Sequence, residues 1–531
     1  MPETGYDYII VGSGSAGSVL ANRLSARPEI KVLLLEAGGS DNSFYVRMPA
    51  GVANLSGPRF NWGYKTAPQA AMKGRRMYWP RGRLIGGSSS VNAMVYMRGQ
   101  SADYDHWRQL GNAGWSYDDV LPYFKKAERN ERLRDRFHGA EGPLNVAERP
   151  YTNPLSHVFV EAAQQAGLPF NPDFNGAVQL GCGLFQVTQK NGRRWSASSA
   201  YLHPVTTREN LTVLKKAQAT RVLIEHGRAV RVEYARGRRR HTARATQEVV
   251  LAAGAINSPQ LLLLSGVGPA DELRTLGVSV AHDLPGVGKN LQDHLNVNIV
   301  QRAKSGSTLD SKNRGLAPIA VALEFLLYGA GPGTSNVAEA GAFAISEDGA
   351  ATPDMQYHFI PAQVVNHART PMDGDGVTLH ACCLRPQSRG EIRLATADPL
   401  EAPVMDPNYL AADYDLNILI AGLRQGREIL AAQAFRPWLG EERLPGPSVR
   451  SNAELEDFIR AAAETEYHPV GTCKMGSDPL AVVDDQLRLR GIERLRVIDA
   501  SIMPTIVSGN TNAPVIMIAE KGADMMLAAA A

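Results

Sequence analysis

The residues best suited to ligand chemistry lie near the N-terminus, in the pattern Gly12-x-Gly14-x-x-Gly17. In such a pattern the first glycine permits a tight turn, the second lets the backbone approach a pyrophosphate, and the third lets a helix pack closely on a strand. The phosphates would then lie at the start of the helix, beside Ser15 and Ala16, where free N–H groups favour negative charge. The pattern therefore predicts a dinucleotide-binding site.

The elements around these glycines agree with that prediction. An apolar run from Tyr8 to Val11 indicates a strand before the turn, and Val19 to Leu24 indicates a helix after it. A second strand over Lys31 to Leu35 ends in Glu36, about 20 residues past the glycines, where an acid holds a ribose hydroxyl. A glycine turn in an ordinary α/β domain is the alternative, but it does not explain Glu36.

Size and composition limit the classes of protein that need to be considered. The 531 residues suffice for two or more domains, and 44% hydrophobic with 21% charged residues argues against extensive disorder. A net charge of +3 gives no support for nucleic-acid binding. The local basic run Arg236–Arg240 lies between two strand-like segments, so we expect a solvated hairpin turn there.

Cysteine usage and hydropathy bear on the compartment. The four cysteines show no CxxC spacing, which argues against a disulfide framework and favours a reducing compartment, and we expect no metal site. Cys382 and Cys383 are adjacent inside an apolar run, so we expect these two to be buried thiols. The first strand begins about six residues in, which argues against a signal peptide. No apolar stretch reaches the ~18 residues of a membrane-spanning helix. The sequence thus favours a cytoplasmic protein, with peripheral contact at the inner face of a membrane left open.

A second glycine-rich stretch follows a Gly-, Pro- and aromatic-rich region over residues 41–80 that predicts little regular structure. The small residues at 86–90 would let the backbone lie against a flat or charged ligand, and we expect an apolar helical segment after them. A plain glycine loop before a helix is the alternative interpretation.

Several long motifs together make the sequence resemble the glucose–methanol–choline (GMC) family of FAD-dependent oxidoreductases. The matching segments, in chain order, are residues 82–105, 254–268, 385–394, 468–476 and 509–514. The resemblance covers nearly the whole chain. It implies an α/β fold, in which a Rossmann-like FAD-binding domain is joined by a substrate-binding domain of antiparallel sheet plus helices.

The resemblance also implies a discontinuous division of the chain. The FAD-binding domain is expected over residues 1–155, 200–300 and 464–531, and the substrate-binding domain over residues 156–199 and 301–463. Alternating residues predict strands in the second domain at Met355–Ile360 and 391–394, and helical stretches are expected around residues 413–433 and 452–463.

Oxidation of an alcohol by hydride transfer needs a hydride acceptor, a base for the hydroxyl proton and a donor that holds the oxygen. Flavin is the acceptor at its N5 position, and histidine suits the base because its ordinary pKa is near 6.5. The resemblance assigns the base to His468, and Asn512 matches the family's second catalytic position. An amide holds the alcohol oxygen but cannot act as a base. Asn512 would equally serve as a helix N-cap.

The resemblance extends to the cofactor contacts. The implied FAD-binding residues beyond the first motif and Glu36 are Gly87, Ser88, Asn92, Ala93, Val95, Ala219, Asp499, Ala500 and Asn512. Some relatives attach FAD covalently through a histidine next to the position of Asn92; Val91 stands there in this chain, so we expect non-covalent FAD. Residues 283–294 resemble the family's return toward the cofactor, with a structured loop as the alternative.

The candidate substrate-binding residues are Glu339, His358 and Tyr467. His358 lies on an apolar strand, where a core histidine is the equal alternative, and the bulky ring of Tyr467 precedes His468, where it would narrow access. Glu339 matches a glutamate that contacts a cationic head group in choline-oxidising relatives, but the aromatic residue that precedes it there is absent, which favours a structural role for Glu339 as the alternative. The apolar lining expected from the second domain disfavours an isolated charge. We expect a neutral primary alcohol, polyol or sugar-like hydroxyl as substrate, with choline poor, and a quinone or dye as electron acceptor in preference to oxygen.

Three other functions remain open from the sequence. They are choline dehydrogenation, a hydroxynitrile lyase that retains flavin without reducing it, and flavin binding without turnover. The His468 and Asn512 pair argues against the last, because a protein that only binds flavin needs neither residue.

Overall fold

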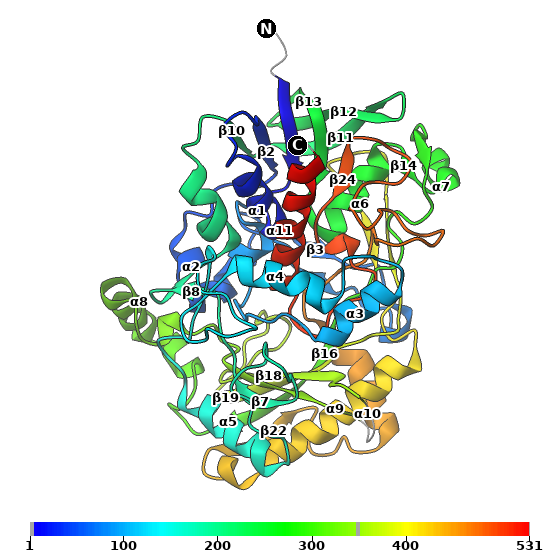
Figure 1. Cartoon of the computed structure of the whole chain (residues 1–531). Coiled ribbons are helices and arrows are strands. Elements are labelled where there is room, and N and C mark those ends of the chain that lie inside the picture. The colour runs from blue at the N-terminus through cyan, green and yellow to red at the C-terminus, as the bar shows by residue number, and fades with distance from the viewer. Residues whose placement is uncertain (1–4, 347–350, 530–531) are drawn as a thin grey trace.

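The computed structural model describes residues 5–346 and 351–529. Two seven-stranded sheets form the frame of the molecule, one above the other in Figure 1, and most of the helices cover them. The upper sheet is called the nucleotide sheet below, and the lower one the substrate sheet. The mixed α/β fold expected from the sequence is confirmed.

The nucleotide sheet has the order β10-β2-β1-β13-β12-β11, and β24 also pairs with β13. Strands β10, β2, β1, β13 and β24 are parallel, whereas β11, β12 and β13 form an antiparallel meander. All five residues of β2 are buried, as parallel strands covered on both faces require. The strands are β1 (Gly5–Val11), β2 (Val32–Glu36), β10 (Leu211–Lys215), β11 (Gln218–Glu225), β12 (Arg228–Arg236), β13 (Arg239–Leu251) and β24 (Leu495–Val497).

The turn between β1 and α1 (Ser15–Leu24) has the close contacts that its glycines predict. Gly12 has a φ of +98°, a conformation that side chains rarely adopt, and a Cβ on Gly17 would lie 1.8 Å from the Gly12 carbonyl oxygen. The strand and helix are therefore packed as tightly as the dinucleotide pattern requires.

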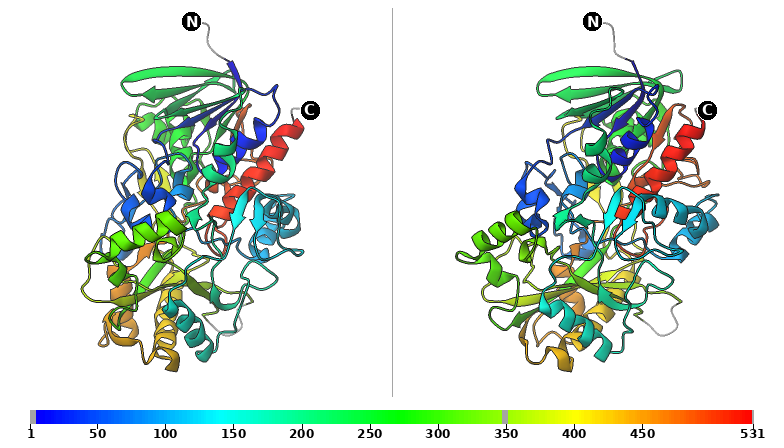
Figure 2. Two further views of the ribbon diagram at one scale, coloured as in Figure 1. Left: turned by 90° about the vertical axis from the view of Figure 1, so that its left-hand side faces the viewer. Right: turned by 60° about the vertical axis from the view of Figure 1, so that its left-hand side comes forward.

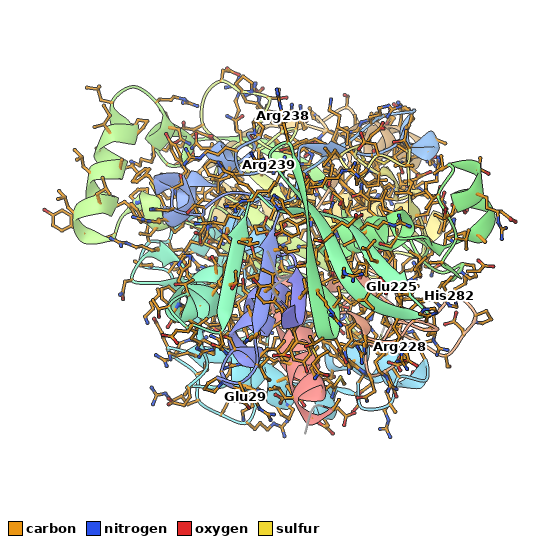
Figure 3. The ribbon with its side chains drawn as sticks, turned by 90° about the horizontal axis from the view of Figure 1, so that it is seen from above. Glu29, Glu225, Arg228, Arg238, Arg239 and His282 are labelled. Carbon is orange, nitrogen blue, oxygen red and sulfur yellow. The ribbon has the colours of Figure 1, made fainter. Side chains whose placement is uncertain are left out.

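The basic run forms the predicted hairpin. Arg236 of β12 pairs with Arg239 of β13, and residues 236–240 are exposed. Arg238 and Arg239 lie at the tip of this hairpin in Figure 3. Their charges are solvated and take no part in the core.

The substrate sheet is antiparallel, with the order β22-β16-β19-β18-β17-β7, and β23 also pairs with β16. Helices α5 (Pro154–Gln165), α9 (Asp413–Ala431) and α10 (Asn452–Ala462) lie on the side away from the nucleotide sheet (Figure 2). The strands are β7 (Gly181–Leu184), β16 (Leu295–Ala303), β17 (Ala340–Ala344), β18 (Met355–Ile360), β19 (Gly376–Cys383), β22 (Leu439–Leu444) and β23 (Glu464–Thr465). Strand β16 crosses the expected domain boundary at residue 300.

The remaining elements are short or connect the two sheets. The helices are α2 (Phe44–Arg47), α3 (Ser101–Gln109), α4 (Tyr117–Ala127), α6 (Gly254–Leu264), α7 (Ala270–Thr275), α8 (Ala317–Tyr328) and α11 (Asn512–Ala529). The two-strand pairs are β3 (Tyr64–Lys65) with β4 (Tyr78–Trp79), β5 (Glu128–Asn130) with β6 (Leu144–Val146), β8 (Gln189–Lys190) with β9 (Arg193–Arg194), β14 (Val267–Gly268) with β15 (His282–Asp283), and β20 (Glu391–Arg393) with β21 (Val404–Asp406).

The prediction of a helical segment after the glycines at 86–90 is wrong. Residues 91–100 form no helix, and α3 begins only at Ser101. Val95 instead bridges to Val187, and the Tyr96 N–H donates to the Gln186 carbonyl at 2.9 Å. Long-range backbone pairing with the 181–190 segment therefore prevails over the local apolar pattern.

Within residues 5–346 and 351–529, no helix is long and apolar enough to cross a bilayer. The same residues contain no group of three or more His, Cys, Asp or Glu side chains that could hold a metal ion. All four cysteines are buried free thiols, which confirms the prediction for Cys382 and Cys383.

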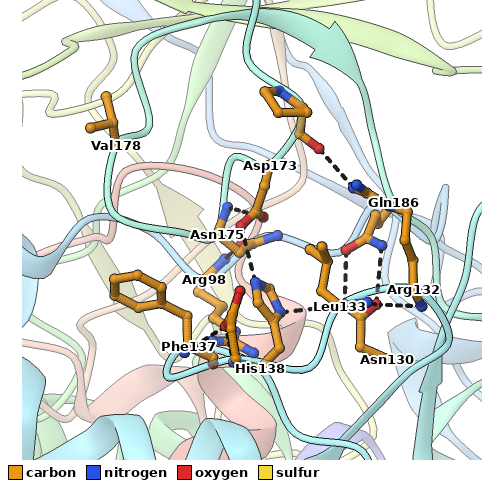
Figure 4. A network of polar contacts seen from close by, with 12 residues as sticks. Arg98, Asn130, Arg132, Leu133, Phe137, His138, Asp173, Asn175, Val178 and Gln186 are labelled. Atoms are coloured by element: carbon orange, nitrogen blue, oxygen red, sulfur yellow. Dashed lines mark hydrogen bonds and ion pairs between the residues drawn. The ribbon is translucent and has the colours of Figure 1, made fainter.

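A buried ionic network anchors the loops below α4 (Figure 4). His138 bridges two carboxylates, with Nδ1 3.2 Å from Glu128 and Nε2 3.0 Å from Asp173, and Arg98 lies 2.6 Å from Glu128. Burial alone would lower the pKa of His138, but hydrogen bonds to Asp173 and Glu128 raise it to about 9. Burial would raise the pKa of Glu128, but Arg98 and His138 lower it. Burial would likewise raise the pKa of Asp173, but His138 lowers it.

We expect this network to stabilise the protein most strongly in mildly acidic solution. The raised pKa of His138 gives stability that is complete below its unfolded value near 6.5 and is lost as pH rises through about 9. The lowered carboxylate pKa values give stability that is present above about 4 and lost on acidification. His138→Gln should therefore reduce the melting temperature more at pH 6 than at pH 9.5. Equal reductions at both pH values would show that His138 is not charged in the folded protein.

Candidate active site

A cavity of about 550 Å³ lies between the two sheets. One wall comes from the glycine turn of the nucleotide sheet and from residues 87–95 and 499–512, whereas the other includes His358, Ile360 and Val364 of the substrate sheet and its loops. Segments nearly 500 residues apart in the chain therefore meet in one cavity.

The glycine end of this cavity fits a dinucleotide. No side chain caps the N-terminus of α1, so its first N–H groups are left for a ligand. A Cβ on Gly87 would lie 2.8 Å from the Gly14 Cα, so two glycine backbones meet where a flat or charged group must pass. The donors and the close backbone approach are what a pyrophosphate requires.

Most of the predicted cofactor residues line the cavity. They are Gly12, Gly14, Ser15, Ala16, Glu36, Gly87, Ser88, Asn92, Ala93, Val95, Ala219, Asp499, Ala500 and Asn512. Gly17 is not among the lining residues, because it packs α1 against the Gly12 carbonyl. The Asp499 carboxylate accepts hydrogen bonds from the Gly254 N–H (2.8 Å) and the Ser258 hydroxyl (2.5 Å), which fixes the start of α6 beside the cavity.

Glu36 is buried at the end of β2 and has three protein donors. Its carboxylate accepts from the Ser13 N–H (3.0 Å), the Ser13 hydroxyl (2.6 Å) and the Gly38 N–H (2.6 Å). Burial raises the pKa of Glu36. The carboxylate thus braces the glycine turn and also faces the cavity where a ribose would lie.

His468 is held rigidly at the other end of the cavity. Its backbone N–H donates to Asp293 at 2.7 Å, and its ring Nδ1 lies 3.0 Å from Nδ1 of His294. Burial, and then the neighbouring His294, lower the pKa of His468 well below 6.5. The ring is therefore neutral at pH 7, which is the state a base requires.

The protonated nitrogen of His468 follows from its neighbours. His294 Nε2 lies 2.9 Å from the Leu384 carbonyl, which only accepts, so this nitrogen carries a proton. Burial lowers the pKa of His294 to about 4, so His294 is neutral and its Nδ1 is an acceptor. His468 Nδ1 must then donate to it. The lone pair of His468 is consequently on Nε2, the nitrogen nearest Asn510.

The partner of His468 is Asn510, and the prediction of Asn512 at this position is corrected. Asn510 Nδ2 lies 3.3 Å from His468 Nε2, and its Oδ1 accepts from Gln356 Nε2 at 3.3 Å. Asn512 is the first residue of α11, and its Oδ1 accepts from the Ser15 hydroxyl at 2.7 Å. Asn512 therefore lies on the pyrophosphate side, because the helix start turns its side chain toward α1.

Of the two interpretations of Glu339, a substrate contact and a structural role, the geometry supports the structural one. This residue is fully buried and is not among those that line the cavity. Its carboxylate accepts from the Ser335 hydroxyl (2.5 Å), the Asn153 N–H (2.7 Å) and the Ser156 hydroxyl (2.7 Å). Glu339 thus ties β17 to the start of α5 and does not face a substrate.

A different acid lies in the cavity wall. Glu466 accepts from His380 Nδ1 at 2.8 Å and lies 3.9 Å from His358 Nδ1. Burial alone would raise the pKa of Glu466, but His380 and His358 lower it to about 2. The predicted His358 and Tyr467 do line the cavity. The sequence analysis did not identify four further residues of the site, which are His294, His380, Glu466 and Asn510. Glu466 and Asn510 lie two residues from His468 and Asn512, and this proximity in the sequence was the only signal for them.

Comparison with known proteins shows what nearly the whole chain is similar to. Models of the N- and C-terminal parts of GMC oxidoreductases match residues 6–296 and 386–519. The chain is 48% identical to human mitochondrial choline dehydrogenase, over 98% of this chain and 89% of that protein. It is 48% identical to the alcohol dehydrogenase [acceptor] of Pseudomonas putida, over 98% and 96%.

A solved structure with a similar fold is pyridoxine 4-oxidase from Mesorbium loti. It has 35% sequence identity and a TM-score of 0.89, covering 98% of each chain. GMC oxidoreductases bind FAD, which suits a cavity with a dinucleotide cradle at one end and a neutral histidine at the other. With both family models and full-length relatives in agreement, the chain belongs to the GMC oxidoreductase family.

Proposed function

We propose that this FAD-dependent oxidoreductase of CH–OH donors oxidises a neutral primary alcohol, polyol or sugar-like hydroxyl, with His468 as base and Asn510 as oxygen donor. The observation that carries the proposal is the 3.3 Å contact between His468 Nε2 and Asn510 Nδ2 in the cavity wall. A lone pair and an N–H that meet in a buried cavity suit a hydroxyl group, which donates to the first and accepts from the second.

The residues of this chain account for the handling of the proton. FAD, held by the α1 N-terminus, Glu36 and residues 87–95, supplies the hydride acceptor when bound. His294 holds His468 Nδ1 as the donor, so that Nε2 takes the hydroxyl proton. Asn510 donates to the oxygen as its charge develops, and Gln356 keeps the amide in that orientation.

The cavity lining supports a neutral substrate. Apolar groups that line it include Val337, Ala338, Ile360, Ala362 and Val364. An unpaired charge would be costly to bury against them. Two buried polar atoms of cavity-lining residues, His358 Nδ1 and His380 Nε2, have no hydrogen-bond partner in the described chain, and they suit hydroxyl groups. Choline is the second candidate, favoured by the charged Glu466 in the wall.

We expect a neutral primary alcohol to bleach the flavin absorbance under anaerobic conditions, and choline to have at least tenfold lower kcat/KM. Tenfold corresponds to about 1.4 kcal/mol of transition-state preference. Absence of bleaching by any alcohol would indicate lyase chemistry instead. A kcat/KM for choline tenfold above that of a neutral alcohol of similar size would favour the second candidate, particularly if Glu466→Gln removed that preference selectively.

We also propose that FAD is bound without a covalent link and passes its electrons to a quinone or a dye. No histidine stands at Val91, and one relative carries an acceptor in its name. Acid precipitation should therefore release all the yellow colour into the supernatant. Flavin that stays with the precipitated protein would contradict the non-covalent assignment.

A further inference from the structure

Helix α8 presents an apolar surface to solvent. Of its twelve residues only Glu324 is charged, and only Phe325 is buried. Seven of the thirteen large hydrophobic side chains exposed in the described chain lie on or beside this helix: Tyr45, Leu316, Ile319, Leu323, Leu326, Leu327 and Tyr328. This set is called the α8 face. In Figure 1 the helix lies at the left edge of the molecule, away from both sheets.

Such a helix is normally covered. A helix that is apolar nearly all round belongs in a core or in lipid, because water solvates it poorly. Its single acid, Glu324, is exposed, and its carboxyl lies against Gly331 just beyond the C-terminal end of the helix, where a Cβ would come within 2.2 Å of it. Leu327 is 69% exposed and Tyr328 is 76% exposed. The α8 face therefore needs an apolar partner.

Cations border the α8 face at its C-terminal end. Arg47, Lys190 and Arg193 line a hollow together with Leu326, Leu327 and Tyr328. Asp41 also borders this hollow, but its carboxylate is engaged by His203 (3.0 Å) and by the Ser198 hydroxyl (2.6 Å). Among the side chains of the described residues, the Arg47 guanidinium donates to the neutral amide of Asn42 and to no carboxylate. The border is therefore positively charged.

We propose that the α8 face docks on an anionic phospholipid surface, with α8 lying in the plane of the interface. Twelve residues span about 18 Å, against about 30 Å of bilayer hydrocarbon, so α8 would lie on the membrane and not cross it. Aliphatic side chains would enter the acyl region, Tyr45 and Tyr328 would lie at the headgroup level, and the three cations would face lipid phosphates.

The charge distribution favours lipid over a second copy of the chain. A symmetric contact would bring Arg47, Lys190 and Arg193 of one protomer toward a face that carries the same cations, and like charges oppose each other. The docking does not depend on the reaction proposed above. It would nevertheless bring the cavity near the membrane, because Val321 of α8 lines that cavity, as do Leu309 and Pro332 on either side of the helix.

The test is flotation of the FAD-loaded enzyme with vesicles of phosphatidylcholine and phosphatidylglycerol in equal parts. The wild-type protein should float with these vesicles and bind pure phosphatidylcholine more weakly. Leu323→Gln/Leu327→Gln should weaken binding at least about tenfold, because two exposed aliphatic groups no longer enter the bilayer. Arg47→Gln/Arg193→Gln should weaken binding to the anionic vesicles about fivefold per cation and leave binding to phosphatidylcholine unchanged.

The matched control is Leu400→Gln/Leu480→Gln, which removes two exposed leucines far from α8 in the sequence. These control substitutions should leave flotation unchanged. Light scattering without lipid tests whether a second copy of the chain covers the α8 face instead. If the wild-type protein is a dimer and the Leu323→Gln/Leu327→Gln protein is a monomer, the face binds a second copy and the proposal is overturned. Equal flotation of wild type and Leu323→Gln/Leu327→Gln would overturn it as well.

Discussion

Replacing His468 with alanine is expected to slow the reduction of bound FAD by alcohol about 10²–10⁴-fold, the usual contribution of a general base. His468 is buried, is neutral because burial and His294 lower its pKa, and has its lone pair on the nitrogen nearest Asn510. Anaerobic stopped-flow absorbance at the flavin band measures the rate directly.

Measuring how much FAD the variant retains distinguishes a loss of catalysis from a loss of the cofactor-binding site. The His468→Ala protein should keep its FAD and its fold, since the cofactor cradle lies at the glycine end of the cavity. His106→Ala is the matched control, because His106 is exposed on α3 and is not among the residues that line the cavity. A His468→Ala enzyme that reduces FAD at the wild-type rate would remove His468 from the mechanism.

The second large effect is expected for Asn510→Ala, with Asn512→Ala as its matched partner. Loss of one donor to a developing oxyanion costs about 10²–10³-fold in rate, and Asn510 Nδ2 is the donor beside His468. Asn512→Ala removes the contact with the Ser15 hydroxyl at the start of α1 instead. We expect it to loosen FAD retention on dilution and to change the reduction rate of FAD-loaded enzyme much less.

The two measurements together decide which asparagine acts on substrate. Rates of anaerobic reduction give the effect on chemistry, and the FAD remaining after gel filtration gives the effect on binding. If Asn512→Ala slowed reduction a hundredfold and Asn510→Ala did not, the sequence-based assignment would be restored and the geometry rejected.

Local sequence patterns were sufficient to predict the elements whose conformation depends on neighbouring residues. The turn from β1 to α1 needs glycines at fixed spacing, and these are visible in the sequence. Alternation and periodicity likewise predicted β18, α9 and the hairpin at Arg236–Arg240. The conformation of the segment after Ser90 could not be predicted in this way, because the segment with which it pairs lies about 90 residues away.

The details of the site depended on contacts that no local pattern reveals. Asn510 and Asn512 are two residues apart, and only the direction of the chain entering α11 decides which one faces His468. Glu339 has hydrogen-bond partners over 180 residues away, Asn153 and Ser156, so its burial could not be read from its neighbours.

The support of His468 has a consequence for how the enzyme moves. The base is held by Asp293 and His294 at the start of β16, and His294 is held by Leu384 just after β19. Asn510 lies two residues before α11, which packs with α1 beside the nucleotide sheet, and its Oδ1 accepts from Gln356 of β18 in the substrate sheet. The base and the oxygen donor are thus fixed by contacts that join the two sheets, and a hinge between the sheets would strain these contacts. We therefore expect the two sheets to keep one relative position during the reaction, with alcohol entering by displacement of side chains and loops.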